Sequence, residues 1–140
     1  SSLVNSRLVL FSTRDGGQTW ELIQMIELYS QPGQAALFNL ESGGKWWAAG
    51  SGKPVLMTNG SGRDAQVFTP TGITGNLLAL DFTSGRDGWA ISQEGNCTVA
   101  KPKSGDGCSP DSRRFTCQMT SSLWATTDGG HSWLEITPAP

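Results

Sequence analysis

Side chains that commonly perform catalysis are scarce in this sequence of 140 residues, which has one histidine and one tyrosine. His131 follows two glycines in a turn-like segment, so we expect it to be exposed to solvent rather than to act as a base or a ligand. A histidine-rich metal site would need a second histidine. Tyr29 has no acidic residue beside it except Glu27. We therefore predict no catalytic residue, no cofactor and no bound metal.

An internal repeat organises the chain. Residues 37–49 align without a gap on residues 79–91, at an offset of 42 residues. Each copy is typical of an apolar strand, a Ser-Gly turn and a second strand built around a tryptophan, Trp47 or Trp89. Repeats of about 40 residues are characteristic of folds in which one small sheet recurs.

A second repeated element is a turn motif, present at residues 13–20 (the first turn motif) and at residues 126–133 (the second turn motif). Its aspartate can accept hydrogen bonds from backbone N–H groups two or three residues on, and its glycines can adopt the positive φ of a tight turn. Its tryptophan can bury a large ring at the start of the next strand. Thr19 or Ser132 adds a hydroxyl that can satisfy another local group. The residues predicted to be structural parts of the two motifs are Thr13, Asp15, Gly17, Thr19, Trp20, Thr126, Asp128, Gly130, Ser132 and Trp133.

Residues 57–62 look like a degraded copy of the turn motif, with Asn59 in the aspartate position and no tryptophan. Together the two repeats predict ten short strands, grouped as one pair followed by two sets of four. The predicted strands are residues 7–13, 20–25, 34–40, 45–49, 55–58, 65–68, 76–82, 88–92, 121–126 and 133–137.

An insertion at about residues 93–120 precedes the second turn motif and contains all three cysteines of the chain. The spacing of Cys97, Cys108 and Cys117 matches no zinc-binding pattern. If the flanking strands continue as one antiparallel hairpin with Ile91 opposite Leu123, Cys97 lies opposite Cys117. We therefore hypothesise a Cys97–Cys117 disulfide, with Cys108 free near the tip.

The turn motif resembles the Asp-box, or BNR, repeat of sialidase-like β-propellers, and the fuller pattern is most similar to the photosystem II assembly and stability factor family and its bacterial relatives. The resemblance covers residues 7–137 apart from the insertion. It implies an all-β, partial propeller domain of about two and a half four-stranded antiparallel blades. Residues 1–30 would form the outer half of one blade, residues 31–70 a second blade, and residues 71–140 a third blade carrying the insertion.

The same resemblance implies a non-catalytic scaffold that binds another protein outside the cytoplasm. The alternative is a fragment of a sialidase-like glycoside hydrolase or of a carbohydrate-binding propeller. A sialidase needs an arginine cluster for the substrate carboxylate and a tyrosine nucleophile assisted by a glutamate. No arginine of this chain stands in the Arg-Ile-Pro context that sialidases carry, which favours the scaffold.

Charge and composition bear on the partner. The formal net charge of −2 gives no electrostatic footprint for nucleic acid. No apolar run approaches the roughly 20 residues of a membrane span, so we expect no membrane insertion by this segment. Two glycosylation sequons, at Asn59 and Asn96, and the cysteines favour an extracytoplasmic location, which is secreted, periplasmic, lumenal or part of an ectodomain.

Two and a half blades cannot close a ring, because propellers typically have four to eight. We expect either the rest of the polypeptide or self-association to complete it. Trp46 and Trp47 are adjacent in a predicted strand and therefore face opposite sides. Trp46 either packs on a neighbouring blade or is exposed and binds a partner.

Overall fold

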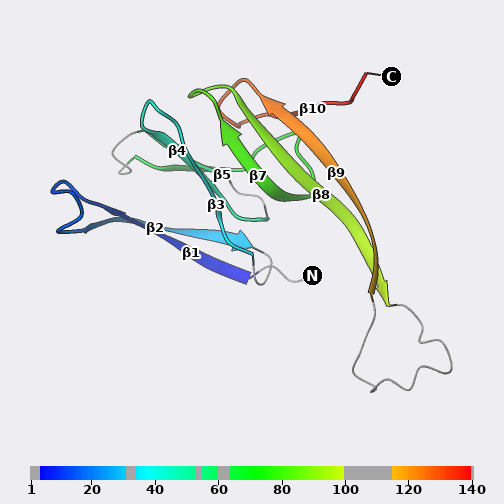
Figure 1. Cartoon of the computed structure of the whole chain (residues 1–140), viewed down its shortest axis with the longest axis horizontal. Helices are drawn as coiled ribbons and strands as arrows, with labels where there is room; N and C mark the ends of the chain where they lie inside the picture. Colours follow the sequence, from blue (N-terminus) through cyan, green and yellow to red (C-terminus); the bar gives the residue numbers. More distant parts are fainter. Residues whose placement is uncertain (1–3, 31–33, 53–54, 60–63, 100–114, 140) are drawn as a thin grey trace, which may run out of the picture.

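The computed structural model describes residues 4–30, 34–52, 55–59, 64–99 and 115–139, which form ten β-strands in three sheets (Figure 1). All pairings between these strands are antiparallel, and each sheet follows chain order. The first sheet contains β1 (Val4–Ser12) and β2 (Glu21–Ser30). The second sheet contains β3 (Leu37–Leu40), β4 (Lys45–Ala49), β5 (Val55–Asn59) and β6 (Gln66–Phe68). The third contains β7 (Asn76–Phe82), β8 (Gly88–Val99), β9 (Phe115–Thr126) and β10 (Leu134–Glu135).

The prediction of an all-β chain with small antiparallel sheets is therefore confirmed. Strand register also bears out the 42-residue repeat. Asn39 lies opposite Trp47 in the second sheet, and Asp81 lies opposite Trp89 in the third. Residues 42 apart thus occupy equivalent positions in two successive sheets.

The larger core lies between the second and third sheets and is centred on Trp47, whose side chain is completely buried. The Trp47 ring stacks on Phe82, with ring centroids 3.8 Å apart and an interplanar angle of 5°. Its indole N–H donates to the carbonyl oxygen of Gly129 over 3.2 Å. The Asn39 side chain adds a polar link, since it donates to the Asp81 carboxylate and accepts the backbone N–H of Phe82.

A smaller core lies between the first and second sheets, where Ile26 and Leu28 of β2 pack with Trp46 and Ala48 of β4. Trp46 is only 6% exposed. The expectation that it binds a partner is therefore wrong for this structure, because the first sheet covers its ring. The other alternative, packing on the neighbouring sheet, is what the structure shows. β4 is buried on both faces, as expected of a strand between two other sheets.

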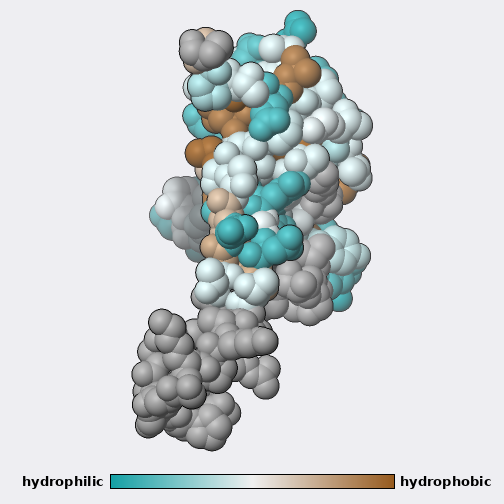
Figure 2. All heavy atoms as spheres, turned by 90° about the vertical axis from the view of Figure 1, so that its right-hand side faces the viewer, coloured by the Kyte–Doolittle hydropathy of each residue, from teal (hydrophilic) through white to brown (hydrophobic). Residues whose placement is uncertain are grey.

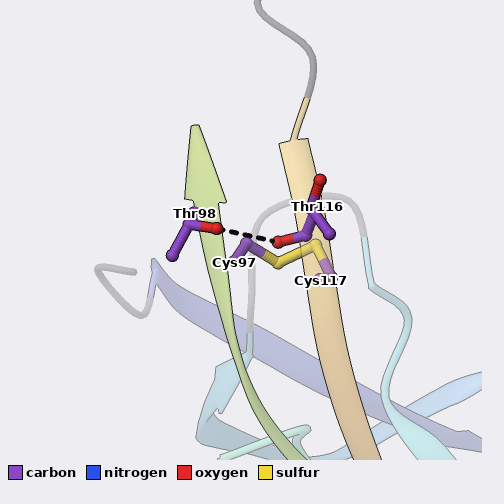
Figure 3. Close-up of a disulfide and its surroundings, with 4 residues drawn as sticks. All are labelled: Cys97, Thr98, Thr116 and Cys117. Carbon is purple, nitrogen blue, oxygen red and sulfur yellow. Dashed lines mark hydrogen bonds between the residues drawn. A yellow bond between two sulfur atoms is a disulfide. The ribbon is translucent and has the colours of Figure 1, made fainter. Parts of the chain in front are cut away.

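The predicted hairpin insertion is present in the described residues, where β8 and β9 pair as far as Val99 and Phe115 (Figure 1). Cys97 lies opposite Cys117 in this ladder, and the two form a disulfide (Figure 3). The predicted pairing is confirmed, while Cys108 lies outside the described residues. β8 and β9 each have 12 residues, which is longer than predicted, because the ladder continues without interruption into the insertion.

The repeat offers a matched pair of tryptophan variants that tests the packing between the sheets. Trp47→Ala removes a fully buried ring and should lower the free energy of unfolding by about 4 kcal/mol. Trp89→Ala, at the equivalent position with 45% of the side chain exposed, should cost about 1 kcal/mol. Urea denaturation at low protein concentration measures both values. Equal losses would contradict the face-to-face stacking of the second and third sheets.

Candidate functional site

The two turn motifs adopt the same backbone conformation at two separate places in the fold. The first joins β1 to β2, and the second joins β9 to β10. Gly16 and Gly17 have φ values of 70° and 93°, and Gly129 and Gly130 have values of 75° and 90°. Side chains with a Cβ rarely adopt this region, so the paired glycines permit the reversal at both sites.

A carboxylate closes each turn. Asp128 accepts hydrogen bonds from the Ser132 backbone N–H at 2.9 Å, the Ser132 hydroxyl at 2.5 Å and the Thr126 hydroxyl at 2.8 Å. Asp15 accepts the same set from Thr19 and Thr13 at 2.6–2.9 Å. The shortest backbone bond to each aspartate comes from four residues ahead, whereas two or three were predicted, and the Gln18 backbone N–H, three residues ahead of Asp15, contributes as well.

The threonine that opens each motif has a role that sequence reasoning did not assign. The Thr126 hydroxyl donates to Asp128 and accepts the backbone N–H of Gly130 at 3.0 Å. The Thr13 hydroxyl makes the corresponding pair of bonds with Asp15 and Gly17. The signal was the recurrence of threonine two residues before aspartate in both copies.

The tryptophan that ends each motif closes the turn from the other side. The indole N–H of Trp133 donates to the Gly130 carbonyl at 2.9 Å, and that of Trp20 donates to the Gly17 carbonyl at 3.0 Å. Trp133 is 3% exposed, as predicted, with its ring edge-on to Phe82. Trp20 is 62% exposed, so the prediction that its ring is buried is wrong. Among the described residues, the first sheet has no strand in the position that β7 occupies beside Trp133.

Hydrogen bonding fixes the protonation state of both aspartates. The hydroxyl and backbone N–H of Thr19, together with the Thr13 hydroxyl, lower the pKa of Asp15 from 3.8 to about 2. For Asp128, burial raises the pKa. The hydrogen bonds from Ser132 and Thr126 and the charge of His131 outweigh that effect and lower it to about 2. Both carboxylates are therefore ionised acceptors near neutral pH and have no proton to donate.

The strand that leads into the degraded third copy, β5, differs by one residue in register from the sequence alignment. β4 pairs Trp46 with Thr58, and the equivalent pair in the third sheet is Gly88 with Thr126. Thr58 is thus level with Thr126, and Asn59 stands one residue before the aspartate position. The rest of this copy, residues 60–62, lies outside the described residues, so the alignment of the turn itself stays a prediction.

The remaining candidates do not form a catalytic arrangement within the described residues. The exposed His131 ring stacks on Phe68 with centroids 4.0 Å apart. Tyr29, 45% exposed, lies on β2. Arg86 donates to the Thr127 carbonyl and so ties the β7–β8 turn to the second turn motif. In the described part of the chain, no cluster of three or more metal-ligating side chains occurs, and no helix is long and apolar enough to cross a membrane.

Comparisons with protein families, curated proteins and solved structures find no match for this chain. The geometry of the sheets and turn motifs is therefore the basis for assigning a function.

The lowered pKa values predict loss of stability in acid. A carboxyl whose pKa falls on folding contributes stability above its unfolded value of 3.8, and this contribution is lost as pH falls towards 2. Asp128→Asn should lower stability at pH 7 by about 1 kcal/mol and flatten this acid dependence. Asp15→Asn is the matched variant in the exposed motif. Urea denaturation between pH 7 and pH 2 measures the free energy of unfolding as a function of pH. If the variant with both substitutions loses stability in acid as steeply as the unchanged chain, the prediction is wrong.

Proposed function

We propose that this chain is a β-propeller segment that acts as a non-catalytic protein-interaction module outside the cytoplasm. The observation that carries the proposal is the repeated register. Residues 42 apart hold equivalent places in two successive four-stranded sheets that pack face to face around Trp47. In the third sheet, the turn motif joins the last two strands, β9 and β10. In the first sheet, the turn motif joins β1 and β2, so these two strands fit the outer half of a further blade.

The turn motifs support a structural role as Asp-boxes. Each aspartate, hydroxyl and indole N–H directs its hydrogen bonds into its own turn. A general acid of a glycosidase needs a carboxyl whose pKa is raised towards neutral pH. Asp15 and Asp128 have pKa values lowered to about 2, which suits hydrogen-bond acceptors that hold a turn and disfavours that catalytic role.

The disulfide hairpin is the feature that favours a binding role and an extracytoplasmic location. β8 and β9 continue past the other strands of the third sheet, and side chains from Glu94 to Thr98 are exposed (Figure 1). A disulfide is compatible with an oxidising compartment. A cross-linked two-stranded arm loses little conformational freedom on binding, which reduces the entropic cost of capturing a partner.

The glycosidase alternative is tested by assaying the chain with a fluorogenic sialoside and a panel of other glycosides. We expect no turnover above that of buffer, and no shift in melting temperature on adding sialic acid. Tyr29→Phe is the matched control, because it removes the hydroxyl of the one tyrosine in the chain. Turnover that disappears in Tyr29→Phe would establish the glycosidase and overturn the proposal.

Binding through the hairpin is tested with a shortened chain in which residues 93–121 are replaced by an Asn-Gly turn. This variant keeps Ser92, whose buried hydroxyl accepts the indole N–H of Trp124 at 2.8 Å. The tagged chain should enrich a specific protein from the extracytoplasmic fraction of its source organism, and the shortened chain should enrich it at least ~10-fold less. Thermal unfolding confirms that both chains are folded. Equal enrichment would exclude the hairpin as the binding element.

A further inference from the structure

The outer edge of β9 is unpaired where β9 continues into the disulfide-linked hairpin. β10 pairs with β9 only at Ala125 and Trp124. One further bond follows, in which the Ile136 backbone N–H donates to the Leu123 carbonyl at 2.8 Å, and the chain then leaves the sheet (Figure 1). Among the described residues, no strand lies beside this side of β9 from residue 115 to residue 121. We name this side of residues 115–121 the β9 edge.

Strand register shows which backbone groups the β9 edge offers. The Leu123 carbonyl faces β10. Backbone groups alternate along an antiparallel strand, so those of Ser121, Met119 and Cys117 face the same way, away from β8. The Cα atoms of Cys97 and Cys117 are 4.0 Å apart, as in the closer pairs of such a ladder, which exchange no hydrogen bonds with each other. The β9 edge therefore presents alternating N–H donors and carbonyl acceptors that no described strand pairs with.

β9 also lacks the features that normally keep a free edge from pairing with another strand. Such features are charged side chains, prolines and bulges. Residues 115–126 contain no charged residue, no proline and no glycine, and β9 pairs with β8 without a register shift. Extension of β10 in its register would place Pro138 opposite Ser121, and proline has no N–H to donate to the Ser121 carbonyl. The β9 edge is thus regular, and proline chemistry prevents β10 from extending along it.

The other edge of the hairpin, on β8, is less suited to accept a strand. Glu94 places a charge there, and Gly95 weakens strand pairing. A Cβ on Gly75 would lie 2.6 Å from the Cγ atom of Glu94, so the chain before β7 already crowds this edge. Of the two edges of the hairpin, the β9 edge is therefore the one that fits a further strand.

The two faces of the hairpin determine which side chains an added strand would carry. Met119 and the Cys97–Cys117 disulfide lie on one face, and Gln118 and Thr120 lie on the other. All of these side chains are exposed. Because the side chains of paired strands lie beside their cross-strand neighbours, a strand with alternating apolar and polar residues matches the β9 edge. This side of the molecule is mostly pale or hydrophilic in Figure 2, which favours recognition through the backbone over burial of a broad apolar patch.

Charge favours a partner with a basic side chain. Glu94 lies opposite Thr120, and Glu135 lies opposite Trp124 on the same face. Both glutamates are exposed, and β8, β9 and β10 carry no lysine or arginine. These carboxylates would attract a lysine or arginine that an added strand placed opposite Thr120. A second copy of this chain would instead bring a further Glu94 and Glu135 to the same face, so a basic segment of another protein is the better match.

We propose that an extended segment of a partner protein pairs antiparallel with the β9 edge, with alternating apolar and polar residues and a basic residue opposite Thr120. Its backbone N–H and C=O groups exchange hydrogen bonds with Cys117, Met119 and Ser121. Main-chain bonds of this kind supply affinity, and the alternate side chains supply specificity. This mode of binding rests on the proposed role of the hairpin as the binding element, and it specifies the class of partner.

The acetylated peptide Val-Lys-Val-Thr-Val-Lys, labelled at its C-terminus with a fluorophore, is the probe of this pairing. In antiparallel register its valines stand opposite Ser121, Met119 and Cys117, and its first lysine stands opposite Thr120. Fluorescence anisotropy with the full chain should show saturable binding. Methylation of the valine nitrogens should weaken binding at least ~30-fold, whereas methylation of the other nitrogens, which face away from β9, should weaken it less than ~3-fold. No binding at chain concentrations up to about 1 mM, or equal effects of the two methylations, would overturn the proposal.

Variants of the chain test the same pairing from the other side. Ser121→Pro removes an N–H that faces away from β8 and should weaken binding at least ~10-fold, while Ser121→Ala keeps that N–H and should bind like the unchanged chain. Glu94→Gln should remove the preference for this peptide over the peptide with glutamine in place of its first lysine. Melting temperatures confirm that each variant is folded. Equal binding by the two Ser121 variants would contradict pairing at the β9 edge.

Hydrogen exchange followed by NMR locates the added strand without any substitution in the chain. The peptide should slow exchange of the Cys117, Met119 and Ser121 backbone N–H groups at least ~10-fold, and it should leave those of Gln118 and Thr120, which pair with β8, unchanged. A uniform change, or none, would overturn the proposal. Dimerisation of the chain that Ser121→Pro abolishes would also overturn it, because a second copy would then occupy the β9 edge.

Failure of this pairing is distinguishable from failure of the proposed function. If the hairpin binds through its side chains instead, the shortened chain still loses its protein partner, while the peptide shows no binding or no dependence on methylation.

Discussion

The Trp47 side chain connects three parts of the molecule that are distant in sequence. Its ring comes from β4, stacks on Phe82 at the end of β7, and donates to the carbonyl of Gly129 in the second turn motif. Gly129 has a φ of 75°, so the direction of that carbonyl depends on a glycine conformation that the Asp128 network holds in place. Packing of the second and third sheets and closure of the turn are therefore coupled, and neither is an independent local feature.

Complementary side-chain size allows the same backbone repeat to stack. Trp46 fills the space between the first and second sheets, and its equivalent in the third sheet is Gly88. A Cβ on Gly88 would lie 2.6 Å from the Phe82 ring. Trp46 therefore fills the space beside the two-stranded first sheet. At the equivalent position in the third sheet, Phe82 already fills the space, and only a glycine fits. The repeat conserves backbone register and varies side-chain volume, because the core is packed at close to crystalline density.

Local and register-based features were predictable from sequence, whereas burial was predicted correctly for Trp133 and wrongly for Trp20. The Cys97–Cys117 pairing followed from antiparallel register. The two cysteines are equally far along their strands from the predicted pair of Ile91 and Leu123, so they lie opposite each other. The turn motifs followed from bonds among residues at most four apart. The burial of Trp20 was mispredicted, because identical turns differ in their surroundings and exposure depends on strands elsewhere in the chain. Trp46 could be assigned to a face, but its covering by β2 depended on how the first sheet packs.

The chemistry of the turn motifs suits them to a structural role. A carboxylate that accepts three hydrogen bonds from its own turn and has a pKa of about 2 is a poor proton donor and has little capacity left for a ligand. The same bonds make the turn rigid without help from the rest of the protein, which explains why the first motif keeps its geometry although its tryptophan is 62% exposed. A rigid, chemically saturated turn fixes the strands on either side of it. In the binding function that we propose, recognition falls to the surface that those strands present beyond the turns, namely the disulfide-linked hairpin of β8 and β9.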